Sequence, residues 1–216
     1  MLEKMNDFFD SRLDGYEEHM LNNIECAREF YPFTASLLPT NANAKILDLG
    51  CGTGLELDYY FKINPKAEVT GIDLASGMLD ELKRKHSCKK LKLIKGSYFD
   101  IPFSEGTYDA CVSVESLHHF IENDKSKLYR KLYDSLKIGG YFILTDYFAE
   151  DDESEESFFN ELDSLKKKQG ISDNEFYHYD TPLTVAHEVR ALRAGGFSKI
   201  EIMAKWGATY TIRATK

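Results

Sequence analysis

Five short apolar runs, separated by segments with helical spacing, give the central part of the chain its pattern. Runs of this length, bounded by glycine and polar residues, are typical of buried strands. They cover residues 45–49, 68–73, 91–94, 108–114 and 141–145. Between them, apolar residues recur on one face at helical spacing, which predicts amphipathic helices. The clearest of these positions are Met78, Leu79 and Leu82, followed by Leu128, Leu132 and Leu136.

Polar residues and glycines mark the expected ends of these helices. Ser76 is placed to cap the helix that carries Met78, and the pair Gly139 and Gly140 predicts the end of the helix that carries Leu136. Strands that alternate with helices of this length indicate a parallel sheet with helices on both faces.

The N-terminal part of the chain departs from this alternation and favours a helical region that ends near Pro32 and Pro39. Four apolar residues fall at steps of four, three and four, which predicts one face of one helix. They are Met20, Ile24, Ala27 and Tyr31. We therefore expect residues 1–43 to form a helical cap on an α/β domain of residues 44–216.

The C-terminal part of the chain also breaks the alternation. Two helical segments, near residues 158–165 and 185–192, precede the apolar segments 199–203 and 209–214. The few residues between the last two segments predict a hairpin, so that one strand at that edge runs antiparallel. The whole pattern predicts an α/β fold: a Rossmann-like, seven-stranded, mostly parallel sheet with an antiparallel edge strand.

A glycine-rich turn follows the first predicted strand. Asp48, Gly50, Gly52 and Gly54 follow the spacing D-x-G-x-G-x-G. Glycine permits a positive φ and lets a ligand approach the backbone closely, and such a turn lies at the carboxyl edge of the sheet, where ligands bind. A dinucleotide loop would instead have its last glycine at Leu55, so the spacing argues against a nicotinamide-dependent oxidoreductase.

Further segments follow the glycine turn in an order that resembles the class I S-adenosylmethionine (AdoMet)-dependent methyltransferases. They are Val69 to Asp73, Gly96 to Phe103, Tyr108 to Ser113 with His118 and His119, Ile138 to Tyr141, and Leu192 to Phe197. The resemblance is to the ubiquinone/menaquinone-type (methyltransferase type 11) small-molecule branch. It is close over residues 44–148 and looser over the tail, and it does not cover the N-terminal helical region.

The resemblance implies roles in AdoMet binding for the matched positions. Gly50, Cys51 and Gly52 would line the methionine and ribose part, as members of the turn that ends at Gly54. Asp73 would hold both ribose hydroxyls, with Leu74 and Met78 near adenine. Asp48 would brace the turn and could face the amino group of the donor, and Glu115 would lie beside the cofactor.

One position departs from the family pattern. Members of the family usually carry an acid just after the glycine at position 96, where it accepts a hydrogen bond from the adenine amino group. This chain has Ser97 there, whose hydroxyl can still accept that bond, and the backbone of Tyr98 can still meet the ring. Adenine recognition is therefore the cofactor contact in which this chain differs most from the family.

Methyl transfer from a sulfonium needs alignment more than a fixed set of catalytic groups, and it needs a base only when the acceptor carries a proton. The aromatic, histidine-containing segment Tyr177 to Pro182 stands out. Because histidine titrates near neutral pH, His178 is the preferred candidate base. Acceptor contacts are expected from Tyr16, His19, His119, Tyr147, Tyr177 and Tyr179.

The net charge and the cysteine content bear on the kind of substrate, on metal sites and disulfides, and on the cellular compartment. The net charge of −9 disfavours a nucleic-acid substrate, although a local basic run extends from Lys83 to Lys95. The four cysteines form no CxxC pair, which suggests neither a metal site nor disulfides and fits a reducing, cytoplasmic compartment. The start has no signal-peptide pattern and no run is long enough to span a membrane.

We therefore expect a monomeric or homodimeric enzyme that methylates a small molecule. Two interpretations stay open beside it: methylation of a macromolecule such as tRNA or a protein, and a non-catalytic AdoMet-binding module that regulates a partner.

Overall fold

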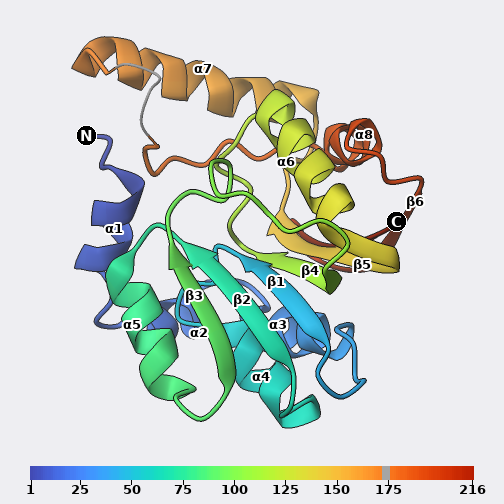
Figure 1. Ribbon diagram of the computed structural model, residues 1–216. Helices are drawn as coiled ribbons and strands as arrows, with labels where there is room; N and C mark the ends of the chain where they lie inside the picture. The colour runs from blue at the N-terminus through green and yellow to red at the C-terminus, as the bar shows by residue number, and fades with distance from the viewer. Residues whose placement is uncertain (172–175) are drawn as a thin grey trace.

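Seven strands form one mixed sheet in the order β3-β2-β1-β4-β5-β7-β6 in the computed structural model, which describes residues 1–171 and 176–216 (Figure 1). The strands are β1 (Lys45–Leu49), β2 (Glu68–Asp73), β3 (Lys90–Lys95), β4 (Tyr108–Val114), β5 (Leu136–Tyr147), β6 (Lys199–Trp206) and β7 (Thr209–Thr215). The first five pair in parallel, whereas β7 runs antiparallel to both β5 and β6. The α/β fold with its antiparallel hairpin at one edge is confirmed.

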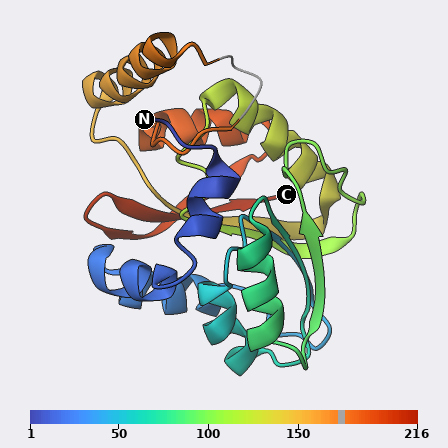
Figure 2. The same ribbon diagram turned by 90° about the vertical axis from the view of Figure 1, so that its left-hand side faces the viewer.

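Two helix layers cover the sheet (Figure 2). The helices are α1 (Met5–Ser11), α2 (Tyr16–Asn23), α3 (Ala27–Ser36), α4 (Leu55–Ile63), α5 (Ser76–Lys85), α6 (Glu122–Ser135), α7 (Asp152–Gln169) and α8 (Val185–Ala194). Alternate residues of β1 enter different cores, because successive side chains of a strand point to opposite faces. Ile46 packs with α3, α4 and α5, and Leu47 packs with α6 and α8. Among the described residues, no helix combines the length and apolar character needed to cross a lipid bilayer.

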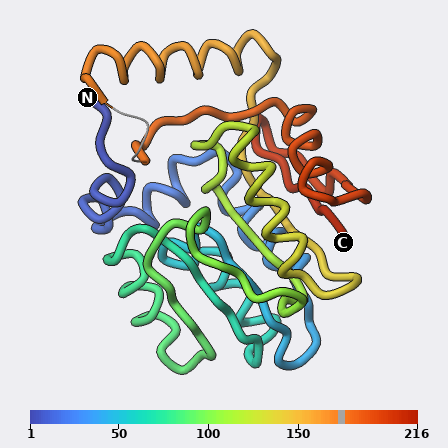
Figure 3. The backbone as a smooth tube through the Cα atoms, turned by 45° about the horizontal axis from the view of Figure 1, so that its top comes forward, coloured from blue at the N-terminus to red at the C-terminus, as the bar shows by residue number. Residues whose placement is uncertain are grey.

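The N-terminal helices α1 and α2 lie across the carboxyl edge of the strands, and α7 forms an outer layer (Figures 2 and 3). The backbone N–H of Leu2 donates to Oε1 of Gln169 at 3.0 Å, which joins the start of the chain to the end of α7. The division of the chain into a cap of residues 1–43 and a second domain stays a prediction. Within the first of these segments, α3 shares its apolar core with α4.

The predicted continuous helix face from Met20 to Tyr31 is wrong. Ile24 is extended and Cys26 is left-handed (φ 58°), so Met20 lies on α2 and Tyr31 lies on α3. All four residues still contribute to one apolar cluster, which explains their spacing. Pro32 lies inside α3 and does not end it. The spacing of apolar residues shows which residues are buried, but not that they lie on one helix. Two helices joined by a bend can together produce the spacing expected of a single helix face.

Two predicted helix boundaries also differ. Ala75, not Ser76, is the residue before α5, and it has no side chain that could cap the helix. The helix α6 ends at Ser135, because Leu136 is already extended (ψ 142°). Gly139 (φ 77°) and Gly140 belong to β5, where the register against β4 shifts. The glycine pair therefore forms an irregular strand segment, and does not stop a helix.

Candidate active site

The glycine turn after β1 has the left-handed backbone that its sequence requires. Gly50, Gly52 and Gly54 have φ values of 67°, 47° and 76°. A Cβ at Gly50 would collide with the Ser116 side chain, and one at Gly54 would collide with Leu82. At Gly52 the nearest atom would be the Tyr16 hydroxyl, 3.9 Å away, so the space above this glycine is open. The turn therefore packs tightly at its two ends and leaves its middle free for a ligand.

Asp73, at the end of β2, faces this turn. Its Oδ2 accepts a hydrogen bond from the backbone N–H of Gly52 (2.8 Å), and its Oδ1 accepts one from that of Ala75 (2.9 Å). Burial raises the pKa of Asp73, and the backbone hydrogen bonds oppose that rise. Each carboxylate oxygen has a further lone pair, so Asp73 can accept bonds from two hydroxyls of a ligand.

A narrow pocket opens between the glycine turn and the N-terminal helices. It brings together residues that the sequence marks as cofactor or acceptor contacts and others that the sequence does not mark. The first group is Gly50, Gly52, Asp73, Leu74, Met78, Tyr98, Glu115, Tyr16 and His119, and the second is Met5, Phe9, Val114 and Ser116. Met5 and Phe9 could not be found from the motifs, because no motif covers the N-terminal helical region.

Four residues expected to contact the cofactor do not line the pocket. Cys51 is buried against Gly71, and Gly54 packs on Leu82. The hydroxyl of Ser97 accepts a bond from the backbone N–H of Phe99 (3.1 Å) and so shapes its own turn. Asp48 is the fourth, and it lies buried behind the turn.

Asp48 forms a buried pair with another acid. Its side chain shares a hydrogen bond with Glu56, at the start of α4, so one of the two carboxyls is protonated. Burial, followed by the charge of Glu56, raises the pKa of Asp48 well above its ordinary value. Asp48 Oδ2, Glu56 Oε1 and Thr53 Oγ1 have no hydrogen-bond partner among the described residues. The pair can therefore accept further hydrogen bonds from a group bound at the turn.

A second and larger cavity, here called the chamber, adjoins the pocket and has a volume of ≈ 760 Å³. Phe9, Tyr16, Glu115 and His119 line both cavities. The chamber also contains His19, Tyr147 and His178, which the sequence suggested as acceptor or base residues. Sequence reasoning missed Trp206 and Ala208, because the turn between β6 and β7 carries no motif.

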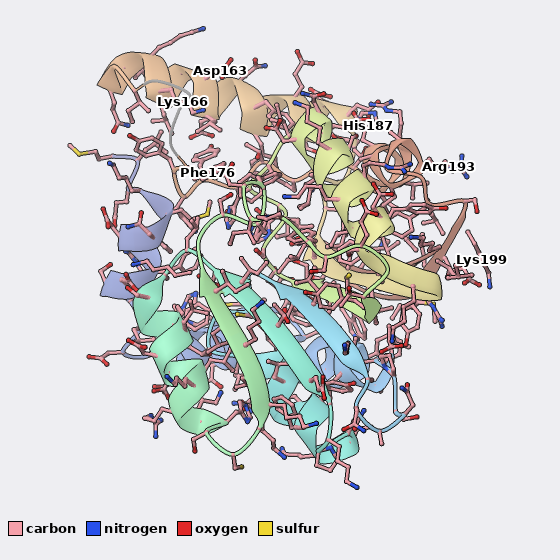
Figure 4. All side chains as sticks on the ribbon, in the orientation of Figure 1. Asp163, Lys166, Phe176, His187, Arg193 and Lys199 are labelled. Atoms are coloured by element: carbon pink, nitrogen blue, oxygen red, sulfur yellow. The ribbon has the colours of Figure 1, made fainter. Side chains whose placement is uncertain are left out.

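Residues 3–5 and residues 176–181 lie side by side over the chamber, and together they are here called its roof. The backbone N–H of Met5 donates to the carbonyl of Phe176 (3.0 Å), and that of His178 donates to the carbonyl of Glu3 (3.0 Å). Figure 4 shows Phe176 beneath α7. The N–H of Thr181 donates to the carbonyl of His118 (2.8 Å), which fixes the second segment to the end of β4. The roof of the chamber is thus hydrogen-bonded to the sheet edge.

His118 forms a buried ion pair with Asp146, which lies near the end of β5. Its Nδ1 is 2.5 Å from Asp146 Oδ1, and Asp146 Oδ2 accepts the backbone N–H of Leu117 (2.8 Å). Burial lowers the pKa of His118, but the charge and hydrogen bond of Asp146 outweigh burial and raise it. The pKa of Asp146 is lowered because the same partner outweighs its burial. Asp146 therefore favours the charged form of His118 and fixes the orientation of its ring.

His119 is held in one tautomer. Its Nδ1 lies 3.1 Å from the carbonyl oxygen of Tyr179 and 3.1 Å from Asp180 Oδ1. Because both partners are oxygen acceptors, Nδ1 carries the hydrogen and Nε2 carries the lone pair. Burial and then the charge of His118 lower the pKa of His119, so its ring is neutral near pH 7. The hydroxyl of Tyr147 donates to Asp180 and holds it in place.

His178 stacks on Phe8, with ring centroids 3.5 Å apart, and lies 5.0 Å from the ring of His119. Burial and then the charge of His119 lower its pKa to about 4. Two expected acceptor contacts do not line the chamber. Tyr177 forms a bridge with Lys4, and the Tyr179 side chain bonds to Glu161 on α7.

The group His118, His119 and Asp180 brings possible metal-ligand atoms within 4.8 Å of one another. In the described site, His119 Nδ1 is already engaged by the carbonyl of Tyr179 and lies beside Asp180. The arrangement instead matches a neutral base held by a carboxylate.

The family profile described as "Methyltransferase domain" matches residues 47–144 of the chain. A fatty-acid O-methyltransferase of Mycolicibacterium smegmatis is 32% identical over 102 residues. That alignment covers 47% of the chain, and the chain spans only about a third of that relative, 36% of its length. A carboxy-S-adenosyl-L-methionine synthase of Campylobacter curvus is 29% identical over 191 residues, with 84% of the chain and 80% of the relative covered.

The fold has counterparts among solved structures. An S-adenosylmethionine-dependent methyltransferase of Mesorhizobium loti has a TM-score of 0.63 at 17% identity, and the match covers 86% of this chain and 96% of that one. The family match falls on the strands and the glycine turn that form the pocket. Residues 47–144 of the chain are therefore similar to the methyltransferase domain family, and the fold of the chain is similar to that of a solved AdoMet-dependent methyltransferase.

Proposed function

We propose that the chain transfers a methyl group from AdoMet to a small-molecule acceptor bound in the chamber. The observation that supports this proposal most directly is that the pocket and the chamber adjoin and share lining residues. Phe9, Tyr16, Glu115 and His119 line both of them, so a sulfonium in the pocket can meet an acceptor in the chamber.

The pocket residues divide among the parts of AdoMet. Asp73 would accept hydrogen bonds from the two ribose hydroxyls, and Leu74 and Met78, which line the same pocket, would pack against adenine. The open backbone at Gly52 would receive the methionine part, and the buried pair of Asp48 and Glu56 lies behind that backbone. None of these contacts needs a phosphate group, which agrees with a sulfonium ligand.

The chamber supports a small acceptor. Its volume lies within the range of about 300–1,000 Å³ that is usual for small-molecule sites. Its roof is hydrogen-bonded on both sides, and its aromatic lining includes Phe8, Phe9 and Trp206. Enclosure aligns the acceptor with the methyl group, and alignment is the main protein contribution to an in-line displacement.

A binding experiment tests the cofactor half of the proposal. S-adenosylhomocysteine (AdoHcy), the demethylated product, is titrated into the protein by calorimetry and also added in a thermal unfolding assay. A ligand present at about 100 times its Kd stabilises the protein by roughly 2.7 kcal/mol. For a chain of this size each kcal/mol raises Tm by roughly 2–4 °C, so a rise of about 5–10 °C is expected. Stabilisation by NADH and not by AdoHcy would overturn the proposal.

Asp73→Ala locates the ribose site. Loss of hydrogen bonds to a charged group costs roughly 1.5–3 kcal/mol, so AdoHcy affinity falls by about tenfold to a hundredfold. The matched control is Asp80→Ala, an exposed acid on α5. Equal AdoHcy affinity in the two variants, measured by calorimetry, would show that the ribose is held elsewhere.

Product analysis tests the reaction itself. Methyl-labelled AdoMet is incubated with the protein and a metabolite extract, and labelled products are identified by mass spectrometry. A labelled small molecule supports the proposal. Label on RNA or protein alone would assign a macromolecular acceptor. Carboxylated AdoMet without methyl transfer would assign instead the reaction named for the Campylobacter curvus relative.

A further inference from the structure

The charges that line the chamber are mostly negative. Its acidic residues are Asp14, Glu25, Glu115 and Asp180, whereas its basic residues are Arg12 and the histidines, of which His118 is the one whose charged form a buried carboxylate favours. The Arg12 guanidinium is bound by both carboxylate oxygens of Glu3, at 3.0 Å each. The neutral state of His119 and His178 near pH 7 adds no positive charge. An anionic acceptor would therefore meet repulsion, and a cationic one would be attracted.

Glu115 occupies the point where the pocket and the chamber meet. It follows β4 with a left-handed backbone (φ 49°), which turns the chain at the sheet edge. The hydroxyl of Thr209 donates to its Oε1 at 3.5 Å. Within residues 1–171 and 176–216, no lysine or arginine forms an ion pair with Glu115. The nearest group that can carry a positive charge is His118, whose ring nitrogen lies within 4.8 Å of the Glu115 and Asp146 carboxylates and is hydrogen-bonded to Asp146.

Burial, followed by the charge of Asp146, raises the pKa of Glu115 to about 8. The charged and titratable groups around it come from several elements: His118 and Asp146 at the ends of β4 and β5, Asp180 from the roof, and Tyr16 from α2. Glu115 is therefore largely protonated at pH 7 in the empty site. A cation bound beside it would favour the ionised form and release the proton.

Aromatic rings supply the rest of the chamber wall. Phe8, Phe9, Tyr16, Tyr147 and Trp206 all line it. Aromatic faces attract cations and also bury apolar groups. A ligand with one positive charge and a small apolar or aromatic body would meet both features.

We propose that the chamber binds its methyl acceptor as a protonated amine, with the ammonium facing Glu115 and the apolar body against the aromatic rings. The inference rests on the proposed function, because it names the class of acceptor for the same site.

His119 completes the reaction for such an acceptor. It lines both cavities, and the tautomer set by Tyr179 and Asp180 leaves its Nε2 with a lone pair. Nε2 removes one proton from the ammonium, and the amine nitrogen uses the released pair to form a bond to the methyl carbon of AdoMet. The carbon–sulfur bond breaks, and its electron pair stays on sulfur as AdoHcy. The products are a methylammonium, AdoHcy and one proton, which His119 passes to solvent.

The experiment uses the full chain with AdoHcy bound and three probes of similar size: phenethylamine, phenethyl alcohol and hydrocinnamate. Trp206 is the one tryptophan of the chain and lines the chamber, so its fluorescence reports occupancy there. Phenethylamine is expected to bind about tenfold or more tightly than the alcohol, and hydrocinnamate most weakly. Calorimetry repeats each titration, so that a binding event without a fluorescence change is also detected.

Glu115→Gln tests the role of the carboxylate. The preference for the amine over the alcohol is expected to fall by about tenfold, while binding of the alcohol changes little. The control is Glu18→Gln, the same substitution at an exposed residue of α2, which should keep the preference. If Glu115→Gln does not fold, calorimetry of the natural protein decides. In buffers of different ionisation enthalpy at pH 7, amine binding should release close to one proton, and alcohol binding should release none.

The outcomes separate the two proposals. Failure of AdoHcy to bind would overturn the proposed function itself. Binding of AdoHcy with equal or tighter binding of the alcohol or the carboxylate, or with no binding of the amine, would overturn the amine assignment alone. Amine binding without proton release, in a protein that keeps its preference in Glu115→Gln, would place the ammonium away from Glu115 and overturn the proposal as stated.

Discussion

His119 and His178 are neighbouring histidines in different electrostatic positions. Both are buried enough for their pKa values to fall, but only His119 has its Nδ1 hydrogen bound to a backbone carbonyl, that of Tyr179, with Asp180 Oδ1 3.1 Å from the same nitrogen. His178 lies flat on Phe8 and forms part of the roof. A histidine with a pKa of about 4 is a weak base, so we expect His119 to remove the acceptor proton and His178 to shape the chamber.

His119→Ala is expected to lower kcat by about a hundredfold or more, the usual contribution of a positioned general base. His178→Ala should change kcat much less and act mainly on the KM of the acceptor. Because the base must be neutral and its pKa is lowered from 6.5, kcat in the natural protein should fall only below about pH 6.5.

The measurement is a pH profile of kcat for the natural protein and both variants, with acceptor saturating. The acidic limb of the profile should vanish in His119→Ala and persist in His178→Ala. The reverse result would return the role of base to His178, where the sequence alone places it.

At the scale of helices and strands, a hydrogen bond joins α1 to α5. The sequence of either helix alone does not predict this bond. The residue before α5 is Ala75, and Oδ1 of Asp10 on α1 accepts the N–H of Gly77 at 2.8 Å instead. The first turn of α5 is thus capped by a side chain from another helix. The same contact holds Met5 and Phe9 of α1 over the cofactor pocket.

Asp10→Ala is expected to weaken AdoHcy binding by about fivefold, because loss of a capping side chain costs about 1 kcal/mol and here loosens the cover of the pocket. Asp7→Ala, at an exposed acid of the same helix, is the control. Calorimetry with AdoHcy compares the two variants, and the idea fails if they bind equally well.

The helices and strands also show which structural features the spacing of apolar residues predicts correctly and which it does not. The strands were predictable because each is a short apolar run next to a turn, and the buried face of α5 followed from Met78, Leu79 and Leu82. The prediction that Gly139 and Gly140 end a helix was wrong, because glycine is compatible both with a helix end and with an irregular strand. The choice depended on pairing of β5 with β4, which is a contact between distant segments.

At the scale of the whole molecule, a buried polar network joins the helices α6 and α8 on one face of the sheet. Nζ of Lys125 on α6 donates to Oε2 of Glu188 on α8 at 2.6 Å, and the Tyr129 hydroxyl donates to Oε1 of the same carboxylate. All three side chains are buried. Removal of one partner from such a pair leaves a charge in the interior without compensation.

Lys125→Met is therefore expected to lower the free energy of unfolding by about 3–5 kcal/mol, as measured by urea denaturation. The double variant Lys125→Met with Glu188→Met should recover most of that loss, because neither charge remains. Lys127→Met, at an exposed position of α6, should change stability by less than about 1 kcal/mol. An equal loss in Lys125→Met and Lys127→Met would show that the pair does not stabilise the fold.

The candidate site was predictable to different degrees in its two halves. The turn from Asp48 to Gly54 and the acid Asp73 are local signals, because backbone conformation and strand ends depend on nearby residues. The chamber is assembled from α1, α2, the roof segment and the β6–β7 turn, and no local pattern records that these meet. Asp180 and Trp206 acquire their places only through those distant contacts.

The sequence by itself determined the alternation of strands and helices, the glycine turn and the resemblance to methyltransferases, because these depend on residue type and spacing along the chain. The tertiary structure alone decided which histidine lines the cofactor pocket with Nδ1 bound to a carbonyl, and that Glu115 forms no ion pair with a lysine or arginine among the described residues. Charge and tautomer depend on what surrounds a group in space, and those neighbours come from segments far apart in the chain.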